Sequence, residues 1–180
     1  MDTVEDEAKM QIGKIDSVWR YPVKGMRGEE VPYIYTSYTG LMGDRIYGVV
    51  AADGDPGHPW HTGRNQEEFL LYKANYQSSE ELLLPDNLDA TYSEWEPGID
   101  PLYPDANAFK VTVETPDGVT YNDIEDAAFI TDLEKLTGRS LRIHTTQRGI
   151  FDARPVSLFS LSAATKLGEE LEMDVDKRRF

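Results

Sequence analysis

Short apolar runs of the kind that form β-strands recur along most of this 180-residue chain. In 30–36, Val31, Tyr33 and Tyr35 fall at every second position, which is the period of a half-buried strand. Turn-forming residues separate the runs, and the segment 53–57, made of Asp, Gly and Pro, is expected to end the third of them. The pattern predicts strands over 12–19, 30–36, 45–51, 69–74, 110–115, 119–122 and 141–145.

The clearest turn in the sequence is Pro116-Asp117-Gly118, which separates two of the predicted strands. Pro fixes the first central backbone angle of such a turn, and Gly accepts a positive φ. We therefore expect a β-hairpin here. The segment 78–108 holds many Pro, Asp, Asn and Tyr residues without sustained periodicity, so we expect loops around at most one short strand.

Two segments place apolar residues at helical spacing. The first, 124–137, follows an Asn-Asp pair at 122–123 that can cap it, and a Gly comes directly after it. The second, 163–173, has Ser160 or Ser162 as its N-cap. The sequence therefore predicts a mainly β fold with two helices, of the α+β class.

The chain is strongly acidic, with 18 Lys and Arg against 33 Asp and Glu and a net charge of -15. Nucleic acids and anionic membrane surfaces are bound mainly by clustered cations, so we expect neither as a partner. The acidic segment 1–10 has neither the cationic nor the apolar region of a signal peptide, and we interpret it as a disordered leader. With no run of the length that spans a membrane, we expect the protein in the cytoplasm.

No cysteine occurs in the sequence, so these residues can form no disulfide, thiolate metal site or cysteine nucleophile. His58 and His61 have a His-x-x-His spacing, but no carboxylate at a suitable spacing accompanies them, and we predict no metal site. The P-loop, the dinucleotide-binding Gly-rich motif and the Gly-x-Ser-x-Gly motif are also absent from the sequence. The sequence identifies no catalytic residue.

Cations are scarce here, so those held in Gly- or Pro-marked turns are candidates for an anion site. Lys24 lies between Pro22, which fixes φ, and Gly25, which permits a tight turn, so the loop is expected to be nearly rigid. Arg45 follows Asp44, which can orient its guanidinium. Thr62 and Arg64 belong to a donor-rich Thr-Gly-Arg-Asn turn. Taken singly, each segment has an ordinary alternative: a solvent-facing turn, a local ion pair or a polar loop.

The order of these motifs resembles that of MOSC proteins with an N-terminal β-barrel region. The segments that carry the likeness are 21–29, 40–45 and 62–64, followed by 151–160 and 174–180. The resemblance implies a MOSC-type β-barrel over 11–145 and the start of the MOSC domain proper over 146–180. Relatives continue with an Arg-x-Asn segment and a metal-binding Cys that this sequence does not contain, so we expect a truncated form of a longer protein.

The same resemblance implies a ligand, the molybdenum cofactor (molybdopterin), which is a pterin with a phosphate and a dithiolene-held metal. Carried over by position, Lys24 and Arg45 would contact its phosphate or pterin. Thr62 and Arg64 would line the same pocket, and Ser160 would add a hydroxyl near a helix start that also offers backbone amides. These five residues are the predicted cofactor-binding set.

At Gly25 the chain departs from the family, where Ser is common. The full-length form is expected to act in molybdenum-dependent reduction or sulfur transfer, as an oxidoreductase or sulfurtransferase. This chain alone is expected to be inactive because it lacks a thiolate. Two alternatives stay open: a non-catalytic β-barrel domain whose exposed sheet edge pairs with another chain or self-associates, and a pyridoxal phosphate protein with Lys24 as the Schiff base. A redox partner protein is a further candidate partner of the full-length form.

Overall fold

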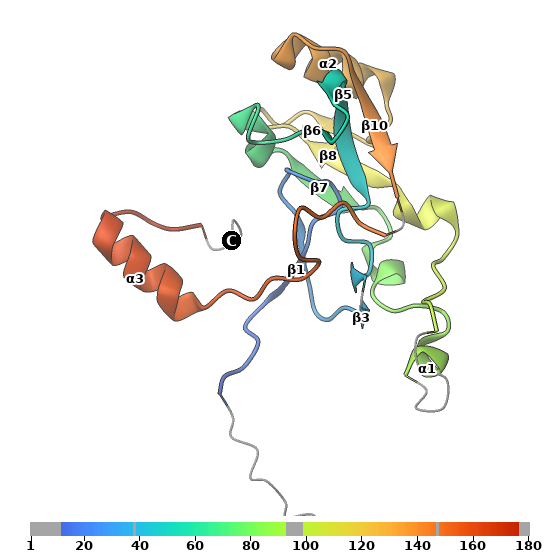
Figure 1. The fold of residues 1–180 in the computed structure, drawn as a ribbon, viewed down its shortest axis with the longest axis vertical. Coiled ribbons are helices and arrows are strands. Elements are labelled where there is room, and N and C mark those ends of the chain that lie inside the picture. Colours follow the sequence, from blue (N-terminus) through green and yellow to red (C-terminus); the bar gives the residue numbers. More distant parts are fainter. Residues whose placement is uncertain (1–11, 38, 93–98, 147, 177–180) are drawn as a thin grey trace, which may run out of the picture.

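The computed structural model describes residues 12–37, 39–92, 99–146 and 148–176 (Figure 1). The predicted leader and the last four residues of the 174–180 motif lie outside these ranges. In chain order the elements are β1 Val18–Arg20, β2 Glu29–Val31, β3 Thr36–Ser37, β4 Gly40–Leu41, β5 Tyr47–Asp55, β6 His58–His61, η1 Glu67–Leu71, β7 Lys73–Tyr76, η2 Ser79–Leu82, α1 Leu88–Thr91, η3 Ala106–Phe109, β8 Val111–Glu114, β9 Thr120–Tyr121, α2 Ala127–Thr137, β10 Leu141–Thr145 and α3 Leu161–Leu171, where η denotes a 3-10 helix.

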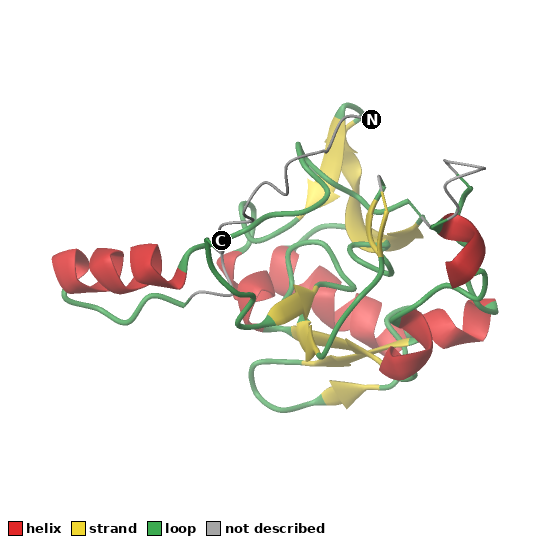
Figure 2. Cartoon of the chain, turned by 90° about the horizontal axis from the view of Figure 1, so that it is seen from below, coloured by secondary structure: helices red, strands yellow, loops and turns green. Residues whose placement is uncertain are grey.

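The described strands form four small antiparallel sheets, in the orders β1-β2, β10-β5-β6, β3-β4 and β7-β8-β9. No one of these sheets closes on itself. The predicted mixed fold is confirmed, and the single-turn helix α1 adds to the two predicted helices. In Figure 1, α2 lies beside β5 and β10, whereas α3 extends away from the body of the molecule, as Figure 2 also shows.

One hydrophobic core joins β5, β7, β8, η1 and α2. Side chains with almost no exposed surface come from each of them: Val49, Phe69, Ala74, Val111 and Phe129. The ring of Phe129 packs against those of Tyr72 and Tyr121. Because strands and helices from distant parts of the sequence share this cluster, their relative positions are held by burial of apolar surface.

A cation is also buried in the body of the protein. Arg20 has no exposed surface and stacks over Tyr76, with 4.7 Å between its Cζ and the ring centre. Its guanidinium donates to Glu29 Oε1 at 2.5 Å, to the Leu82 carbonyl at 2.5 Å and to Ser79. Arg20 therefore ties the β1-β2 sheet to η2.

The first two predicted strands are shorter than expected. Only Val18–Arg20 of 12–19 pairs, opposite Glu29–Val31, and the side chains of Ile12 and Ile15 are exposed. The predicted strand 30–36 is wrong as one element: it breaks into the end of β2 and the start of β3. Pro32 lies at the break and has no N–H with which to continue the ladder.

The predicted strand 45–51 is longer in the structure, because β5 runs through Tyr47–Asp55 and turns directly into β6. The strand was predicted to end before the segment 53–57, but β5 continues to Asp55, inside that segment. Asp55 Oδ1 instead accepts a hydrogen bond from Gly57 N at 2.8 Å, which places the turn between Asp55 and His58. The sequence pattern did not predict β6.

The segment 69–74 was predicted as a strand, but it contains the end of η1 and only the beginning of β7. Burial explains the error, since both parts turn apolar side chains into the core. The described parts of 78–108 contain η2, α1 and the start of η3, and no strand. Residues 93–98 lie outside the described residues.

The hairpin, the last strand and both longer helices agree with the prediction. Gly118 has a φ of +88° between β8 and β9, and Gly138 ends α2 with a φ of +67°. Asp126, not the pair at 122–123, caps α2 by accepting from Ala128 N. Ser160 caps α3, which begins two residues before the predicted 163–173.

Candidate functional site

The loop that carries Lys24 is bound to the first residue of β5. Lys24 N donates to the Tyr47 carbonyl at 2.8 Å, and Tyr47 N donates to the Pro22 carbonyl at 3.1 Å. The side chain of Lys24 is only 9% exposed, and its Nζ donates to Ile150 O at 3.3 Å. The backbone is therefore fixed on both sides of a nearly buried amine, as the Pro and Gly of this turn indicate.

Gly25 brings the Lys24 loop against the loop of Thr62. Its φ is +85°, which other residues adopt only with strain. A Cβ at this position would lie 3.0 Å from Thr62 Cβ and 3.2 Å from Thr62 Cα. Any residue with a side chain would therefore be strained at this position and would crowd the Thr62 loop.

Asp44 and Arg45 are hydrogen-bonded to Tyr21, at the start of the Lys24 loop. Arg45 N donates to the Tyr21 carbonyl at 2.6 Å, and Tyr21 N donates to Asp44 Oδ1 at 2.7 Å. Arg45, next to this double contact, has a φ of +52°, which is unusual for a residue with a side chain. Burial raises the pKa of the Asp44 carboxyl to about 6, against the opposing effects of Arg45, the Tyr21 amide and Arg20.

The Arg45 side chain lies between two aromatic rings. Its Cζ is 5.9 Å from the ring centre of Tyr21 and 5.4 Å from that of Phe151, and its Nε is 3.4 Å from Asp44 Oδ2. The carboxylate thus lies beside the guanidinium, as the sequence predicted. Stacking on both rings limits the directions in which the guanidinium can point.

The third loop is a compact turn stabilised by its own polar side chains. Thr62 N donates to Asn65 Oδ1 at 3.2 Å, and Asn65 N donates to the Thr62 carbonyl at 2.9 Å. Arg64 N donates to Thr62 Oγ1 at 3.4 Å, while the Arg64 side chain is 72% exposed. The hydroxyl of Thr62 therefore helps to shape the loop, and Arg64 is the exposed cation of this loop.

Asp152 joins two of these loops and was not predicted as a site residue. Its Oδ1 accepts from Lys24 Nζ at 2.7 Å, and its Oδ2 lies 3.4 Å from Arg64 Nη2. The hydrogen bond from Lys24 is the main reason that the pKa of Asp152 is lowered below its ordinary value. The Phe-Asp-Ala-Arg motif at 151–154 was the available sequence signal, but it does not show which cations this carboxylate meets.

The predicted residues Lys24, Arg45, Thr62 and Arg64 line one cavity of about 660 Å³. Its other lining residues are Gly25, Gly63, Leu70, Asp152, Ala153 and Arg154. Four of the ten are cations and one is an acid, so the cavity has an excess of positive charge within a chain of net charge -15. Cations gathered in a concave site attract an anionic ligand.

Ser160 lies apart from this cavity and is not among its lining residues. Its Oγ accepts a hydrogen bond from Ala163 N at 3.4 Å, as the N-cap of α3. Arg154 takes a place in the cavity that sequence reasoning missed. The structure therefore brings together four of the five predicted residues and gives the fifth a capping role.

The two histidines of the His-x-x-His segment occupy different surroundings. His58 is exposed, whereas His61 is buried against the ring of Phe69, with Arg139 Nη1 at 3.4 Å from its Nδ1. Burial, with the nearby charge of Arg139, lowers the pKa of His61. In the described parts of the chain, no group of three His, Cys, Asp or Glu side chains has the arrangement of a metal site.

Comparison with known families agrees with the order of these loops. The sequence profile of the MOSC N-terminal beta barrel domain matches residues 12–133, which is more than half of the chain. The chain belongs to the MOSC N-terminal beta-barrel family. Lys24, Arg45, Thr62 and Arg64 fall inside the matched part of this MOSC chain, whereas Asp152 follows it.

No curated protein and no solved structure matches this MOSC-family chain. The profile match over residues 12–133 establishes the family. The predicted boundary between the β-barrel region, ending at 145, and the start of the MOSC domain proper, at 146, stays a prediction. None of the described helices combines the length and apolar character needed to cross a membrane.

Proposed function

We propose that this MOSC-family chain binds the anionic end of the molybdenum cofactor in the cavity lined by Lys24, Arg45 and Arg64. One observation carries the proposal: cations from three separate loops, each singled out by the family motifs, converge on a single cavity of about 660 Å³. This volume lies within the range of roughly 300–1,000 Å³ that holds small-molecule ligands. The donors also suit a phosphate, since guanidinium and ammonium groups bind it through charge-assisted hydrogen bonds.

Each of these residues would have its own part in binding. Lys24, nearly buried and fixed at its backbone, would supply a point charge with little loss of side-chain entropy. Arg45, stacked on two rings, would present a planar fork to a phosphate or to the edge of a pterin. Arg64, exposed at the rim, would close over the ligand.

Asp152 would set how tightly an anion is held. Its carboxylate already neutralises part of the charge of Lys24 and Arg64, so an entering phosphate competes with it for the same donors. In the absence of a ligand, this carboxylate keeps the two loops together against the mutual repulsion of their cations.

When bound, the cofactor supplies the redox or sulfur-handling chemistry at its metal. These 180 residues contain no cysteine to provide a thiolate ligand to that metal. The role proposed for this chain is therefore to bind and orient the ligand's anionic end. Reduction or sulfur transfer is proposed for the full-length form, with the thiolate supplied from outside these residues.

A second candidate, a domain that associates with another protein or a further copy of itself, has one observation in its favour. Apolar side chains on and around α3 are exposed, with Leu158 87%, Leu171 54% and Met173 60% accessible. The pyridoxal phosphate alternative has less support, because Lys24 Nζ is already engaged by Asp152 and Ile150. Size measurements over a range of protein concentrations test the second candidate.

Cofactor retention tests the main proposal. The protein is produced in a bacterial host that makes the cofactor, and molybdenum and pterin are measured in the purified wild type, Lys24→Ala and Arg45→Ala. Both variants are expected to retain less of each. Arg142→Ala, which removes an exposed cation from β10, is the matched control and should retain the wild-type amount. Equal molybdenum and pterin in all four proteins would refute the proposal.

A further inference from the structure

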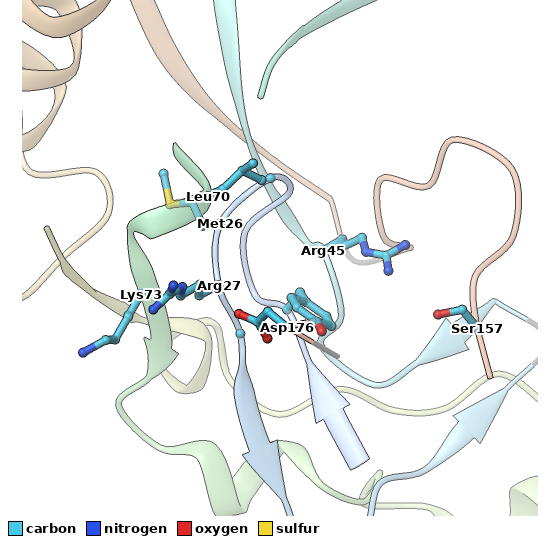
Figure 3. Close-up of a pocket in the computed structure, with 10 residues that line it drawn as sticks. Met26, Arg27, Arg45, Leu70, Lys73, Ser157 and Asp176 are labelled. Carbon is cyan, nitrogen blue, oxygen red and sulfur yellow. The ribbon is translucent and has the colours of Figure 1, made fainter. Parts of the chain in front are cut away.

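We propose a second anion site, built around Arg27 and Lys73, which binds a compact oxyanion such as a phosphoryl group. It occupies a second, adjoining cavity of about 270 Å³, and Lys24 does not line it. Arg27, Arg45 and Lys73 contribute three cations to its wall, and Asp176 is its one acid (Figure 3). The site goes beyond the cofactor proposal, because neither Arg27 nor Lys73 belongs to the predicted cofactor-binding set.

The backbone holds the two cations next to each other. Arg27 N donates to the Tyr72 carbonyl at 2.8 Å, and Ala74 N donates to the Arg27 carbonyl at 3.0 Å. These bonds form a parallel bridge between Arg27 and Lys73, at the first residue of β7. The bridge makes the two residues neighbours, so an anion bound in the cavity interacts favourably with the charge of each.

Arg27 also has unused hydrogen-bonding capacity. Its Nε is buried and has no hydrogen-bond partner among the described residues. A buried donor without a partner is costly, so a rearrangement of the guanidinium that lets an oxyanion in the cavity accept from it is favoured. Lys73 is already paired with Glu114 at 2.7 Å, but both side chains are nearly half exposed, so this ion pair contributes little and can be exchanged.

The size of the cavity limits the ligand. A volume of about 270 Å³ is just below the range of roughly 300–1,000 Å³ that holds a complete small-molecule ligand. One compact group therefore fits, either as a separate inorganic ion or as the end of a longer molecule. The cavity shares Gly25, Arg45 and Leu70 with the larger one, so a longer molecule could reach from one to the other.

Asp176 provides a carboxylate inside this positive cavity. In Figure 3 it lies between Arg27 on one side and Arg45 on the other. A carboxylate among cations lowers the attraction for a second anion, because it already compensates part of their charge. We therefore expect the acid and the bases of this cavity to have opposite effects on affinity.

Titration with inorganic phosphate, followed by the amide NMR signals of the ¹⁵N-labelled chain, tests the site. Gly28, which lines the cavity, and Lys73 should shift together and saturate. Arg27→Gln should lower the affinity for phosphate about tenfold, which is the effect of losing one charge-assisted hydrogen bond. Asp176→Asn should raise the affinity for phosphate, and Arg142→Gln should leave that affinity unchanged.

Further variants separate the two proposals and the two sources of the phosphoryl group. Lys24→Ala should weaken the shifts at Thr62 and Arg64 and leave those at Gly28 and Lys73 intact. If a nucleoside monophosphate shifts Gly28 and Lys73 more tightly than inorganic phosphate, the site takes the end of a longer molecule; equal affinities indicate the inorganic ion.

The absence of saturable shifts at Gly28 and Lys73 in the wild type would overturn the second site, whatever the cofactor content of the protein. Wild-type affinity in both Arg27→Gln and Asp176→Asn would overturn it too. Asp176→Asn is expected to bind phosphate more tightly than the wild type, and a gain in affinity cannot be mistaken for unfolding of the variant.

Discussion

Lys24 Nζ lies 2.7 Å from Asp152 Oδ1, so residues 128 positions apart in the sequence form one ion pair at the wall of the larger cavity. The pair joins a turn inside the family match to a loop that follows it. It gives a nearly buried amine a carboxylate at hydrogen-bond distance, and a buried cation needs such a partner. It also makes Asp152 the residue most directly in competition with an incoming anion.

Replacing Asp152 with Asn should raise phosphate affinity in the cavity of Lys24 and Arg64 by a few fold, because two cations lose a competing carboxylate. The variant should also be less stable at neutral pH, since Lys24 loses its partner. Phosphate titration and urea unfolding measure the two effects. Asp89→Asn, an exposed acid on α1, is the control, and unchanged phosphate affinity in Asp152→Asn would contradict the prediction.

The same carboxylate should leave a signature in acid. The pKa of Asp152 is lowered from its ordinary value of 3.8, chiefly by the hydrogen bond from Lys24. Its contribution to stability is therefore fully present above pH 3.8 and is lost as the pH falls through the lowered pKa. Between pH 5 and pH 3 the wild type should lose more of its free energy of unfolding than Asp152→Asn does.

Asp44 should show the opposite dependence on pH. Burial raises its pKa from 3.8 to about 6, so its contribution is fully present below pH 3.8 and is lost as the pH rises through about 6. The wild type should therefore lose on the order of 3 kcal/mol relative to Asp44→Asn over the whole range from about pH 3 to about pH 7. Urea unfolding of both proteins at several pH values measures this difference, and a constant difference would show that the prediction is wrong.

Gly25→Ala should destabilise the protein for two separate reasons. A side chain at a φ of +85° is strained, and its Cβ would press on Thr62. Gly118→Ala is a matched control, because its φ is +88° and a Cβ there would meet nothing within 4 Å. Backbone strain alone costs roughly 1–3 kcal/mol, so thermal unfolding should show a larger loss for Gly25→Ala. Equal losses would mean that the contact with Thr62 has no effect.

Arg20→Met should be among the most destabilising substitutions in this chain. It would leave Glu29 without its buried partner and remove the bonds to Leu82 and Ser79, at a cost of roughly 3–5 kcal/mol. Adding Glu29→Gln should recover part of the loss, because an unpaired charge is no longer present. Denaturant unfolding of the single and double variants tests this prediction. A double variant with a lower free energy of unfolding than Arg20→Met would contradict it.

The sequence predicted well the elements that depend on neighbouring residues. The turn 116–118, the strand Leu141–Thr145 and the end of α2 at Gly138 follow from local backbone preferences, and the structure confirms them. Motif order within the chain was likewise enough to establish the family and to select Lys24, Arg45, Thr62 and Arg64. These residues lie on turns marked by Gly, and by Pro22 in the case of Lys24, whose local conformational preferences hold wherever the turns are placed.

Only the tertiary structure decided which of these turns meet. The partnership of Lys24 with Asp152, the adjacency of Arg27 and Lys73, and the separation of Ser160 from the cavity all depend on contacts between distant segments. Periodicity cannot predict such contacts, because it records which face of a segment is apolar and not which segment covers it. The sequence by itself determined the turns and their cations, and the packing of the core decided that they surround two adjoining cavities.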